Sequence, residues 1–444
     1  EGRAVGLVVK PLSEEVLSLI RTRSSKATFE SDVFSDENNQ PSTMTTRKWR
    51  HQDEAVAQFC ESKSGVLEMA TGTGKTRVAM RIIHDLFRIG EIQSAIICTI
   101  GNDLLSQWYS EMLEYLTSLN VAYCRQHGTH HELSRYLNHP EESILIVSRA
   151  NLSKALRGMT RPIKSKTLVV HDEVHGLGSP SSIQSLRGAH EGIIYRLGLS
   201  ATPEREYDED GNVFISEEIG PVIYSFSLKE AIERGILCEF DYVPIEYELT
   251  EEDKRRLKSV YSRKAARALQ GKPMADAELY RELSNVYKTA EEKPGILELF
   301  LENHSEILSG TIVFAHTKEY GLAVSESIHR VTERYSTYFD DDNVDRLEAF
   351  GRGELECLIT CHRVSQGIDI RHLKNIVLLS SDRARLETIQ RIGRCLRSDP
   401  NNPGKRACVV DFVRRSEDET KPNADRLRCE WLTELASCRR DFEQ

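Results

Sequence analysis

The sequence contains no long hydrophobic run. Its longest apolar stretches, such as Ala95–Cys98 and Leu168–Val170, span only a few residues, whereas a membrane-spanning helix needs about 20 apolar residues. The apolar patch Val5–Val9 is also too short for a signal peptide and has no basic segment before it. These absences exclude a chain that crosses a membrane, and we expect no membrane partner.

Cysteine spacing typical of a disulfide framework is missing as well. Ten cysteines are scattered along 444 residues, and only Cys357 and Cys361 lie close together, without a second pair that would complete a zinc site. A chain of this length buries enough apolar surface without such crosslinks. We therefore predict free thiols and a reducing, cytoplasmic compartment.

The chain also lacks an excess of positive charge. Lys and Arg number 59 against 69 Asp and Glu, which gives a formal net charge of −10. Proteins that coat nucleic acid through bulk charge are basic, so the composition argues against that class. It is compatible with a basic groove that is confined to one part of the surface.

From Trp49 onward, short apolar segments alternate with helical ones such as Thr76–Ile89 and Leu104–Leu119. This alternation is typical of a parallel sheet with helices on both faces, so we predict an α/β fold. The expected strands are short and buried: Gly65–Glu68, Ala95–Thr99, Ile144–Val147, Leu168–Val170, Gly198–Ser200, Thr311–Ala315, Cys357–Thr360, Asn375–Leu379 and Ala407–Phe412.

Two stretches interrupt this rhythm and divide the chain. Residues 29–46 are polar and indicate a flexible linker, and residues 250–290 are charged, helical in period and poor in β-branched side chains. We predict four parts in chain order: an N-terminal extension with its linker over 1–46, a first α/β domain over 47–240, a helical linker or insert over 241–293, and a second α/β domain over 294–444.

The segment Ala70–Thr76 reads ATGTGKT and lies between a predicted strand and a predicted helix. A glycine-rich loop in that place turns backbone N–H groups toward phosphates at a helix N-terminus. Lys75 would neutralise the β- and γ-phosphates, and the Thr76 hydroxyl would hold Mg²⁺. Met69 stands at the first glycine position of the usual GxxxxGK[ST] pattern. The predicted site binds ATP and Mg²⁺ through Thr71, Gly72, Thr73, Gly74, Lys75 and Thr76.

A second motif, His171–His175, reads HDEVH and follows a buried predicted strand. An Asp at a strand end beside a phosphate loop is suited to bind Mg²⁺, which makes Asp172 a candidate metal ligand. The adjacent Glu173 is a candidate for polarising the attacking water. His175 is a candidate for linking the nucleotide state to a second ligand.

Together with Leu199–Pro203, which reads LSATP, these motifs resemble motifs I, II and III of the superfamily 2 helicases and translocases. The resemblance continues in order from about residue 47 to about residue 415. Its other segments are Trp49–Gln52 (Q motif), Leu104–Trp108 (motif Ia, with Ile100 in place of the usual proline), Ile312–Thr317 (IV), Ile359–Thr360 with Ser365–Asp369 (V) and Gln390–Arg397 (VI). This family implies two RecA-like domains in tandem with a helical insert between them.

The resemblance implies a role for each motif. Motif VI would supply two arginine fingers, spaced i, i+3 on one helix face, which stabilise the charge of the transition state. With the fingers, the catalytic set is Lys75, Asp172, Glu173, Arg394 and Arg397. The further nucleotide contacts would come from Trp49, Arg50, Gln52, Gly367 and Asp369. Coupling between nucleotide and nucleic acid would fall to His175, Ser200, Thr202 and Gln390.

The segment after motif III is similar to the XPB-like branch and to the ATPase domains of type III restriction enzymes. Ala201–Glu206 reads ATPERE, and Tyr207 stands where an Arg-Glu-Asp element would have its acid. Ile219–Gly235 is similar to that branch too. The branch implies DNA rather than RNA as partner, and a protein that is cytoplasmic or associated with the nucleoid.

The basic run within 250–290 has two interpretations. Either it lies along a DNA backbone, as a thumb-like insertion does in some relatives, or it is a solvated amphipathic helix. In the second case its charges pair within the helix, such as Glu251 with Arg255 and Glu252 with Arg256.

Three functions are open from the sequence. The first is an ATP-dependent DNA helicase or double-stranded DNA translocase. The second is the motor subunit of a restriction or phage-defence complex, which moves on DNA without unwinding it and relies on a nuclease or repair partner, because the stretch after Arg397 is too short for a nuclease domain. The third is an RNA helicase or a nucleotide-gated nucleic-acid scaffold.

Overall fold

The computed structural model describes residues 48–203, 208–339, 344–361, 373–380, 385–399, 402, 404–415 and 423–439. The predicted N-terminal extension over 1–46, the Arg205–Tyr207 stretch and the Ser365–Asp369 part of motif V lie outside these residues. All ten cysteines lie within them as free thiols. No helix in the described ranges has the length and apolarity that a bilayer span requires.

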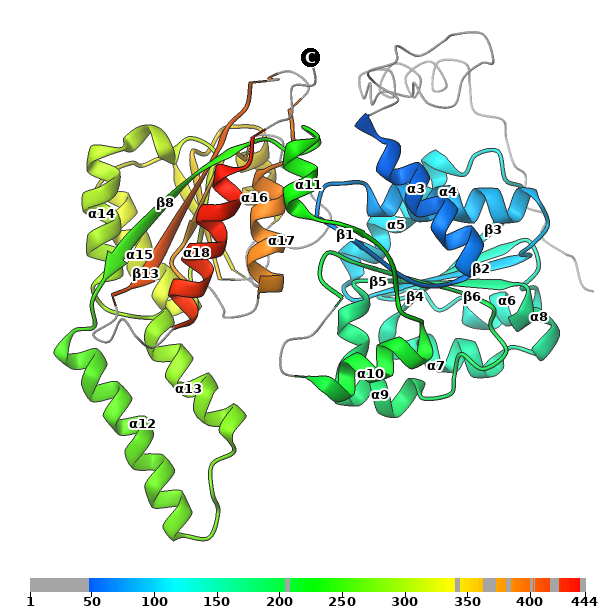
Figure 1. Cartoon of the computed structure of the whole chain (residues 1–444), viewed down its shortest axis with the longest axis horizontal. Helices are drawn as coiled ribbons and strands as arrows, with labels where there is room; N and C mark the ends of the chain where they lie inside the picture. The colour runs from blue at the N-terminus through cyan, green and yellow to red at the C-terminus, as the bar shows by residue number, and fades with distance from the viewer. Residues whose placement is uncertain are drawn as a thin grey trace, which may run out of the picture. The chain divides into compact units, whose positions relative to one another are not determined.

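The first sheet consists of seven strands, and every neighbouring pair is parallel (Figure 1). The strand–helix alternation thus forms the parallel sheet that the sequence predicts, with β3 and β7 as strands that the apolar pattern missed. In spatial order the strands are β3 (Ala122–Gln126), β4 (Ser143–Ser148), β2 (Ser94–Thr99), β5 (Thr167–Asp172), β6 (Tyr195–Ser200), β1 (Ser64–Met69) and β7 (Val222–Phe226).

Both faces of this sheet are buried. Alternate side chains of one strand enter two different apolar clusters: Leu67 and Ile97 enter one, and Val66 and Ile96 the other. The first face packs against α3 (Arg50–Ser62), α4 (Lys75–Arg88), α5 (Asn102–Tyr115) and α11 (Leu228–Glu233). The second packs against α6 (Leu133–Asn138), α7 (Arg149–Gly158), the 3₁₀ turn η1 (Val174–Gly178), α9 (Pro180–Leu186) and α10 (Glu209–Glu218), with the short α8 (Arg161–Ser165) nearby in sequence.

The second sheet has six parallel strands. In spatial order they are β10 (Tyr335–Tyr338), β11 (Cys357–Thr360), β9 (Thr311–Phe314), β12 (Asn375–Leu378), β13 (Ala407–Arg414) and β8 (Phe240–Tyr247). The helices that follow these strands in the chain are α14 (Lys293–Asn303), the 3₁₀ turn η2 (Ser305–Leu308), α15 (Lys318–His329), α16 (Val344–Gly351), α17 (Arg385–Cys395) and α18 (Ala424–Ser437).

The strand β8 corrects the predicted start of the helical segment at residue 241. Residues 240–247 pair with β13 along its whole length and form the edge of the second sheet. Pro244 weakens the strand signal in the sequence because proline lacks the N–H that a ladder needs, but an edge strand tolerates it. The helical segment itself is the hairpin of α12 (Glu251–Leu269) and α13 (Asp276–Lys288), which projects from the second sheet (Figure 1).

Candidate nucleotide site

The predicted phosphate loop connects β1 to α4. Gly72 and Gly74 both adopt positive φ, at 88° and 93°, where a side chain would be strained. A Cβ at Gly74 would also lie only 2.2 Å from the Gln52 Nε2 atom. The two glycines are therefore required for the turn that presents backbone N–H groups at the N-terminus of α4.

Two side chains of the Q motif form hydrogen bonds to this loop. The carbonyl oxygen of Thr73 accepts hydrogen bonds from Gln52 Nε2 (3.1 Å) and from His51 Nε2 (2.8 Å). His51 is fully buried and stacks on the Phe226 ring, with 4.2 Å between centroids. Sequence reasoning missed His51, although its place between Arg50 and Gln52 in the motif was a usable signal.

The other two Q-motif residues of the predicted nucleotide contact lie at the start of α3. Trp49 precedes the first turn of the helix, 5.8 Å from the His51 ring. Arg50 is exposed, and its described contact is an ion pair with Glu54 at 3.0 Å on the same helix. The structure thus joins Gln52 to the phosphate loop and places Trp49 beside His51, while Arg50 pairs with a carboxylate of its own helix.

Lys75 is the first residue of α4, and its ammonium donates to the Met69 carbonyl oxygen at 3.1 Å. Burial lowers the pKa of Lys75, the carboxylates of Glu173 and Asp172 oppose that fall, and Arg397 and Arg394 add to it. All four of these groups therefore lie close enough to Lys75 for their charges to act on it. The structure therefore brings the whole predicted catalytic set together around the phosphate loop.

Asp172 lies at the carboxyl end of β5 and is buried. Its Oδ2 accepts a hydrogen bond from Trp108 Nε1 (2.9 Å), and its Oδ1 accepts one from the Glu173 N–H (3.0 Å). Burial and then the charge of Glu173 raise the pKa of Asp172 to about 6, against the two hydrogen bonds and Lys75. Trp108 of motif Ia is thus both a core residue and the partner that orients the candidate Mg²⁺ ligand.

The backbone turns sharply after Asp172. Glu173 has a left-handed conformation (φ 50°, ψ 55°), which is unusual for a residue with a side chain. The buried Arg149 donates to the carbonyl oxygens of Asp172 (3.2 Å) and Glu173 (3.0 Å). This arginine, which has no motif around it, holds the strained turn in place.

Three of the predicted coupling residues contact one another. His175 Nδ1 lies 3.2 Å from Ser200 Oγ and 3.4 Å from Glu173 Oε2. The N–H of Thr202 donates to the same Ser200 Oγ at 3.1 Å. Motif III is therefore connected to motif II through the His175 ring, as the coupling role requires.

Motif VI packs directly on the phosphate loop. A Cβ on Gly393 would lie 2.7 Å from the Thr71 Cβ, and one on Gly72 would lie 3.4 Å from the Arg397 Cγ. Gly393 is therefore the residue that permits this close approach of α17. The apolar cluster around α4 also continues through Ile236 and Leu237 into the second sheet.

The prediction that Arg394 and Arg397 share a helix face is wrong. Helix α17 ends at Cys395, and Arg397 forms an isolated bridge with Leu237. The buried Lys405 ammonium donates to the Arg397 carbonyl oxygen at 2.9 Å, and the Arg397 N–H donates to the Arg394 carbonyl oxygen at 3.4 Å. Both arginines still lie close enough to Lys75 for their charges to lower its pKa.

Three other predicted residues have no described environment. Gly367 and Asp369 of motif V lie outside the described residues. Gln390 lies on α17, but its side chain is outside the described part of the chain. Their predicted roles stay predictions.

The residues present fit an Mg²⁺-bound nucleoside triphosphate. Thr76 begins the helix beside Lys75, and Asp172 provides an oriented carboxylate, so a hydroxyl and a carboxylate are the oxygen ligands that Mg²⁺ prefers. The lowered pKa of Lys75 indicates a cation that gains from an incoming anion. Helix α4 adds the N–H groups of its first turn.

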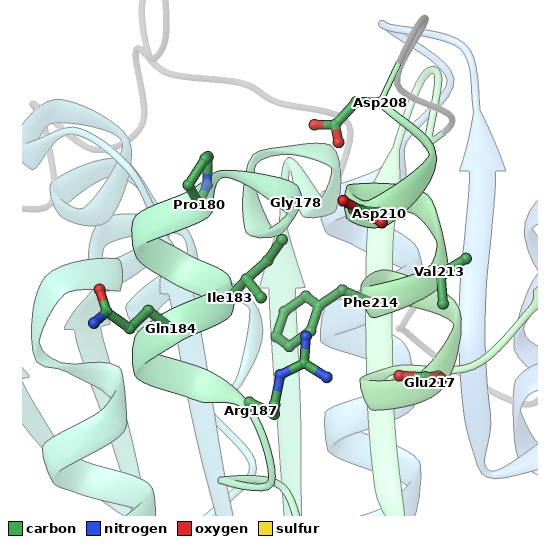
Figure 2. A pocket seen from close by; sticks show the side chains of 10 residues that line it. All are labelled: Gly178, Pro180, Ile183, Gln184, Arg187, Asp208, Asp210, Val213, Phe214 and Glu217. Carbon is green, nitrogen blue, oxygen red and sulfur yellow. The ribbon is translucent and has the colours of Figure 1, made fainter.

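A separate cavity of about 600 Å³ lies on the same domain, between α9 and α10 (Figure 2). Phe214 and Ile183 line it together with the carboxylates of Asp208, Asp210 and Glu217. Arg187 stands over the Phe214 ring at 5.9 Å. None of the predicted nucleotide residues lines this cavity, so it is not the nucleotide site.

Replacing Trp108 with Phe should raise the Mg²⁺ concentration needed for half-maximal ATPase activity by about 10- to 100-fold. The hydrogen bond from Nε1 favours the carboxylate of Asp172, and its loss raises a pKa that is already about 6. Protonation competes with the metal below that pKa, so the defect should be larger at pH 6 than at pH 8. A Mg²⁺ titration of ATPase rate at both pH values measures it.

Trp431→Phe is the matched control, because Trp431 is a half-buried core residue of α18 in the second domain. It should leave the Mg²⁺ dependence unchanged. If Trp108→Phe also left it unchanged at both pH values, Trp108 would only be a core residue.

Comparisons with known proteins agree with these motifs. Residues 45–205 match the family model described as "Type III restriction enzyme, res subunit". Residues 292–399 match the model described as "Helicase conserved C-terminal domain". The first match covers the phosphate loop and motif II. The second covers strands β9 to β12 and motif VI.

Relatives of similar sequence have been named for work on DNA. "DNA 3'-5' translocase XPB2" of Sulfurisphaera tokodaii is 24% identical over 396 residues, which are 84% of this chain and 82% of that protein. "Putative DNA 3'-5' helicase Rad25" of Haloarcula marismortui is 27% identical over 389 residues, 82% of this chain and 54% of that protein. The chain therefore spans most of the first relative and about half of the second.

Among solved structures, the "ATP-dependent Type ISP restriction-modification enzyme LlaBIII bound to DNA" superposes with a TM-score of 0.59 at 15% identity. The match covers 90% of this chain and 30% of that one. At this identity the likeness shows the fold alone, which is two RecA-like parallel-sheet domains in tandem.

Proposed function

This chain belongs to the superfamily 2 helicases and translocases, in their XPB-like and type III restriction branch, and we propose that it is an ATP-driven translocase on double-stranded DNA. The observation that carries the proposal is the contact of Gly393 with Thr71, by which motif VI of the second sheet reaches the phosphate loop of the first. A site built from both domains makes domain arrangement depend on the nucleotide. That dependence is the basis of a motor.

The residues divide the chemistry between them. Bound MgATP would supply the phosphoanhydride bond whose hydrolysis drives movement. Lys75 and the N–H groups of α4 would bind the phosphates, and Glu173 would accept a proton from the attacking water. Arg394 and Arg397 approach from the second domain and stabilise negative charge that develops in the transition state.

His175 is placed to transmit the state of this site. It contacts both Glu173 and Ser200, so a change at Glu173 alters the hydrogen bonds of motif III. Ser200 in turn holds the Thr202 N–H at the start of the segment after β6. We infer that this chain of contacts links hydrolysis to the grip on DNA.

A panel of nucleic acids tests the proposal. Duplex DNA should stimulate ATP hydrolysis more than single-stranded DNA or RNA of the same length, and the protein should displace the third strand of a DNA triplex without separating a forked duplex. Stimulation by RNA alone would favour an RNA helicase, and unwinding of the fork would favour a helicase. A rate at background with every nucleic acid would leave only a nucleotide-gated scaffold.

A motor subunit of a restriction or defence complex is the second candidate. The match of residues 45–205 to a restriction-enzyme model favours it. In that case the purified chain should translocate on DNA without cleaving it, and cleavage should appear when a nuclease subunit is added. Cleavage by the chain alone would contradict this version.

The helical hairpin is a candidate DNA contact with two unlike sides. Three residues of the basic run pair with acids of the other helix: Arg263 with Glu282, Arg267 with Glu278 at 2.6 Å and Lys264 with Asp276 at 3.7 Å. Within α12, pairing is at i, i+3 rather than at i, i+4: Glu251 with Lys254, Glu252 with Arg255 and Asp253 with Arg256.

The opposite side of the hairpin carries exposed tyrosines. Tyr261 follows the core residue Val260, and Tyr280 follows the core residue Leu279. In antiparallel helices, residues that follow core positions stand on one side, whereas Glu278, which precedes Leu279, stands on the other. Tyr261 is 53% exposed and Tyr280 is 66% exposed. The tyrosines thus lie on the side away from the Arg263–Glu282 pair, and we infer that this side faces DNA.

The double variant Tyr261→Ala, Tyr280→Ala should weaken duplex DNA binding by about tenfold or more. Tyrosine hydroxyls donate to phosphate oxygens, and a hydrogen bond to a charged group contributes about 1.5–3 kcal/mol. Fluorescence anisotropy with a labelled duplex at several salt concentrations measures the dissociation constant.

The matched control removes the Arg263–Glu282 pair from the other side with Arg263→Ala, Glu282→Ala, which keeps the net charge. It should bind DNA within a factor of about two of the wild type. An equal loss in both variants would mean that hairpin stability, and not a tyrosine contact, governs affinity.

A further inference from the structure

One ammonium group in the second domain is buried away from the nucleotide site. Lys293, the first residue of α14, is 3% exposed. Its Nζ donates to the carbonyl oxygens of Tyr287 (2.9 Å) and Leu379 (2.8 Å), and it lies 4.2 Å from the centroid of the Tyr247 ring. Burial of a charged group is unfavourable unless its hydrogen bonds are made, so these contacts hold the ammonium in one place.

The two carbonyl groups belong to different parts of the molecule. Tyr287 lies in the last turn of α13, at the root of the hairpin. Leu379 directly follows β12, and four strands, β9 to β12, separate it in sequence from the hairpin. Tyr247, at the end of β8, also donates its hydroxyl to the Tyr287 carbonyl at 3.2 Å. Lys293 is therefore a direct bridge from the hairpin to the carboxyl end of the second sheet.

The next carbonyl group along the chain is held from motif VI. Arg391 of α17 donates from Nη1 to the Ser380 carbonyl oxygen at 2.6 Å and stands 4.5 Å over the Phe314 ring. Helix α17 also carries Gly393 against the phosphate loop, and Arg394 one residue further on. The Leu379 carbonyl is thus bonded to Lys293, which also binds the hairpin root, and the adjacent Ser380 carbonyl is bonded to α17.

The charges around Lys293 are partly balanced. Burial lowers the pKa of Lys293 to about 7; Asp425, Asp411 and Asp253 oppose that fall, and Arg428 adds to it. Asp411 and Asp425 are themselves paired with Arg428, at 2.9 Å and 3.0 Å. Lys293 therefore changes protonation near neutral pH in an environment where charge strengthens its bonds to carbonyl groups.

We propose that Lys293 is a positioning residue that couples DNA at the hairpin to the arginine fingers, by bonding the hairpin root and the end of β12 at once. Because Lys293 is bonded to both α13 and Leu379, a displacement of α13 shifts the backbone at Leu379 and Ser380. The hydrogen bond from Arg391 to Ser380 then transmits this shift to α17. The proposal rests on the proposed DNA-stimulated ATPase. It adds that the stimulation of ATPase activity by DNA depends on one buried side chain, that of Lys293.

The test compares Lys293→Met with Lys293→Gln in the full chain. Met keeps the volume and apolar stem but donates no hydrogen bond, whereas the Gln amide still donates two. Lys293→Met should keep basal ATPase activity and DNA affinity within about twofold, and should lose stimulation by duplex DNA by about tenfold, within the usual range of coupling energies. Lys293→Gln should recover part of the stimulation.

A control variant separates coupling from stability of the hairpin root. Tyr320 donates its hydroxyl to the carbonyl oxygen of Ala290 at 2.8 Å. Ala290 is close to Lys293 in sequence, but this hydrogen bond does not involve β12. Tyr320→Phe should retain stimulation. Unchanged stimulation in Lys293→Met, or equal losses in basal and stimulated rates, would overturn the proposal.

The pH profile of the wild type gives a readout that does not depend on a variant that folds. At saturating DNA, the ratio of stimulated to basal rate should fall as pH rises through about 7, because Lys293 loses its charge. A ratio that is flat from pH 6 to pH 8.5 would contradict the proposal. Absence of any stimulation in the wild type would instead refute the proposed DNA-dependent ATPase, so the two failures are distinguishable.

Discussion

Replacing Glu173 with Gln should lower the DNA-stimulated ATPase rate by about 10²- to 10⁴-fold, the usual contribution of a general base. Glu173 follows the oriented carboxylate of Asp172, and its own backbone is held in a left-handed turn by Arg149. An amide has the same shape but accepts no proton from water. ATP affinity should stay within a few-fold because Lys75 and the phosphate loop are intact. Steady-state hydrolysis and binding of a fluorescent ATP analogue measure the two quantities.

Glu111→Gln provides the control for this substitution. Glu111 is a half-buried carboxylate of α5, and burial raises its pKa, with Asp172 close enough to raise it further. It accepts a hydrogen bond from Gln107 at 2.6 Å, which an amide oxygen also does. Its rate should stay within about threefold of the wild type. A Glu173→Gln enzyme with wild-type turnover would show that another group activates the water.

Replacing Arg394 with Ala should lower the turnover number by about 10³-fold or more, the usual contribution of an arginine finger. Arg394 lies on α17 one residue after Gly393, which contacts the phosphate loop, and its charge acts on Lys75. A transition-state interaction lowers kcat with little change in KM. Arg394→Lys should recover little, because an ammonium group does not reproduce the planar fork. Steady-state ATPase kinetics at saturating duplex DNA measure both constants.

Arg406→Ala is the control for a lost arginine in the second domain. Arg406 pairs with Asp241 and Glu239 at an exposed edge of the second sheet, away from α17. Its kcat should be close to that of the wild type. Wild-type turnover of Arg394→Ala would instead assign the finger role to Arg397, which forms a bridge with Leu237.

Much of the site could be predicted because its parts are local in sequence. The spacing of Gly72, Gly74 and Lys75 dictates a phosphate loop wherever a strand precedes it and a helix follows it. His175 and Glu173 are two residues apart, so their contact follows from the motif. The strands that were predicted are continuous apolar runs, as buried parallel strands are.

The misses have equally definite causes. β3, β7 and β10 are edge strands of their sheets. Most of their side chains are only partly buried, so their sequences are not continuous apolar runs. β8 contains Pro244 and alternates polar with apolar residues. The helix of motif VI ends at Cys395, earlier than the spacing of its arginines suggests. Arg397 instead forms a bridge with Leu237, which is far away in sequence.

By itself, the sequence determined which reactive groups this protein has and in which order they occur, since motif chemistry depends on residue types and short spacings. Only the tertiary structure decided which distant side chain supports each group: Trp108 on Asp172, Arg149 on the turn after it, Gly393 against Thr71, and Lys293 between hairpin and sheet. These contacts join residues from separate elements. Their geometry follows from how strands align and helices pack, and no local pattern records it.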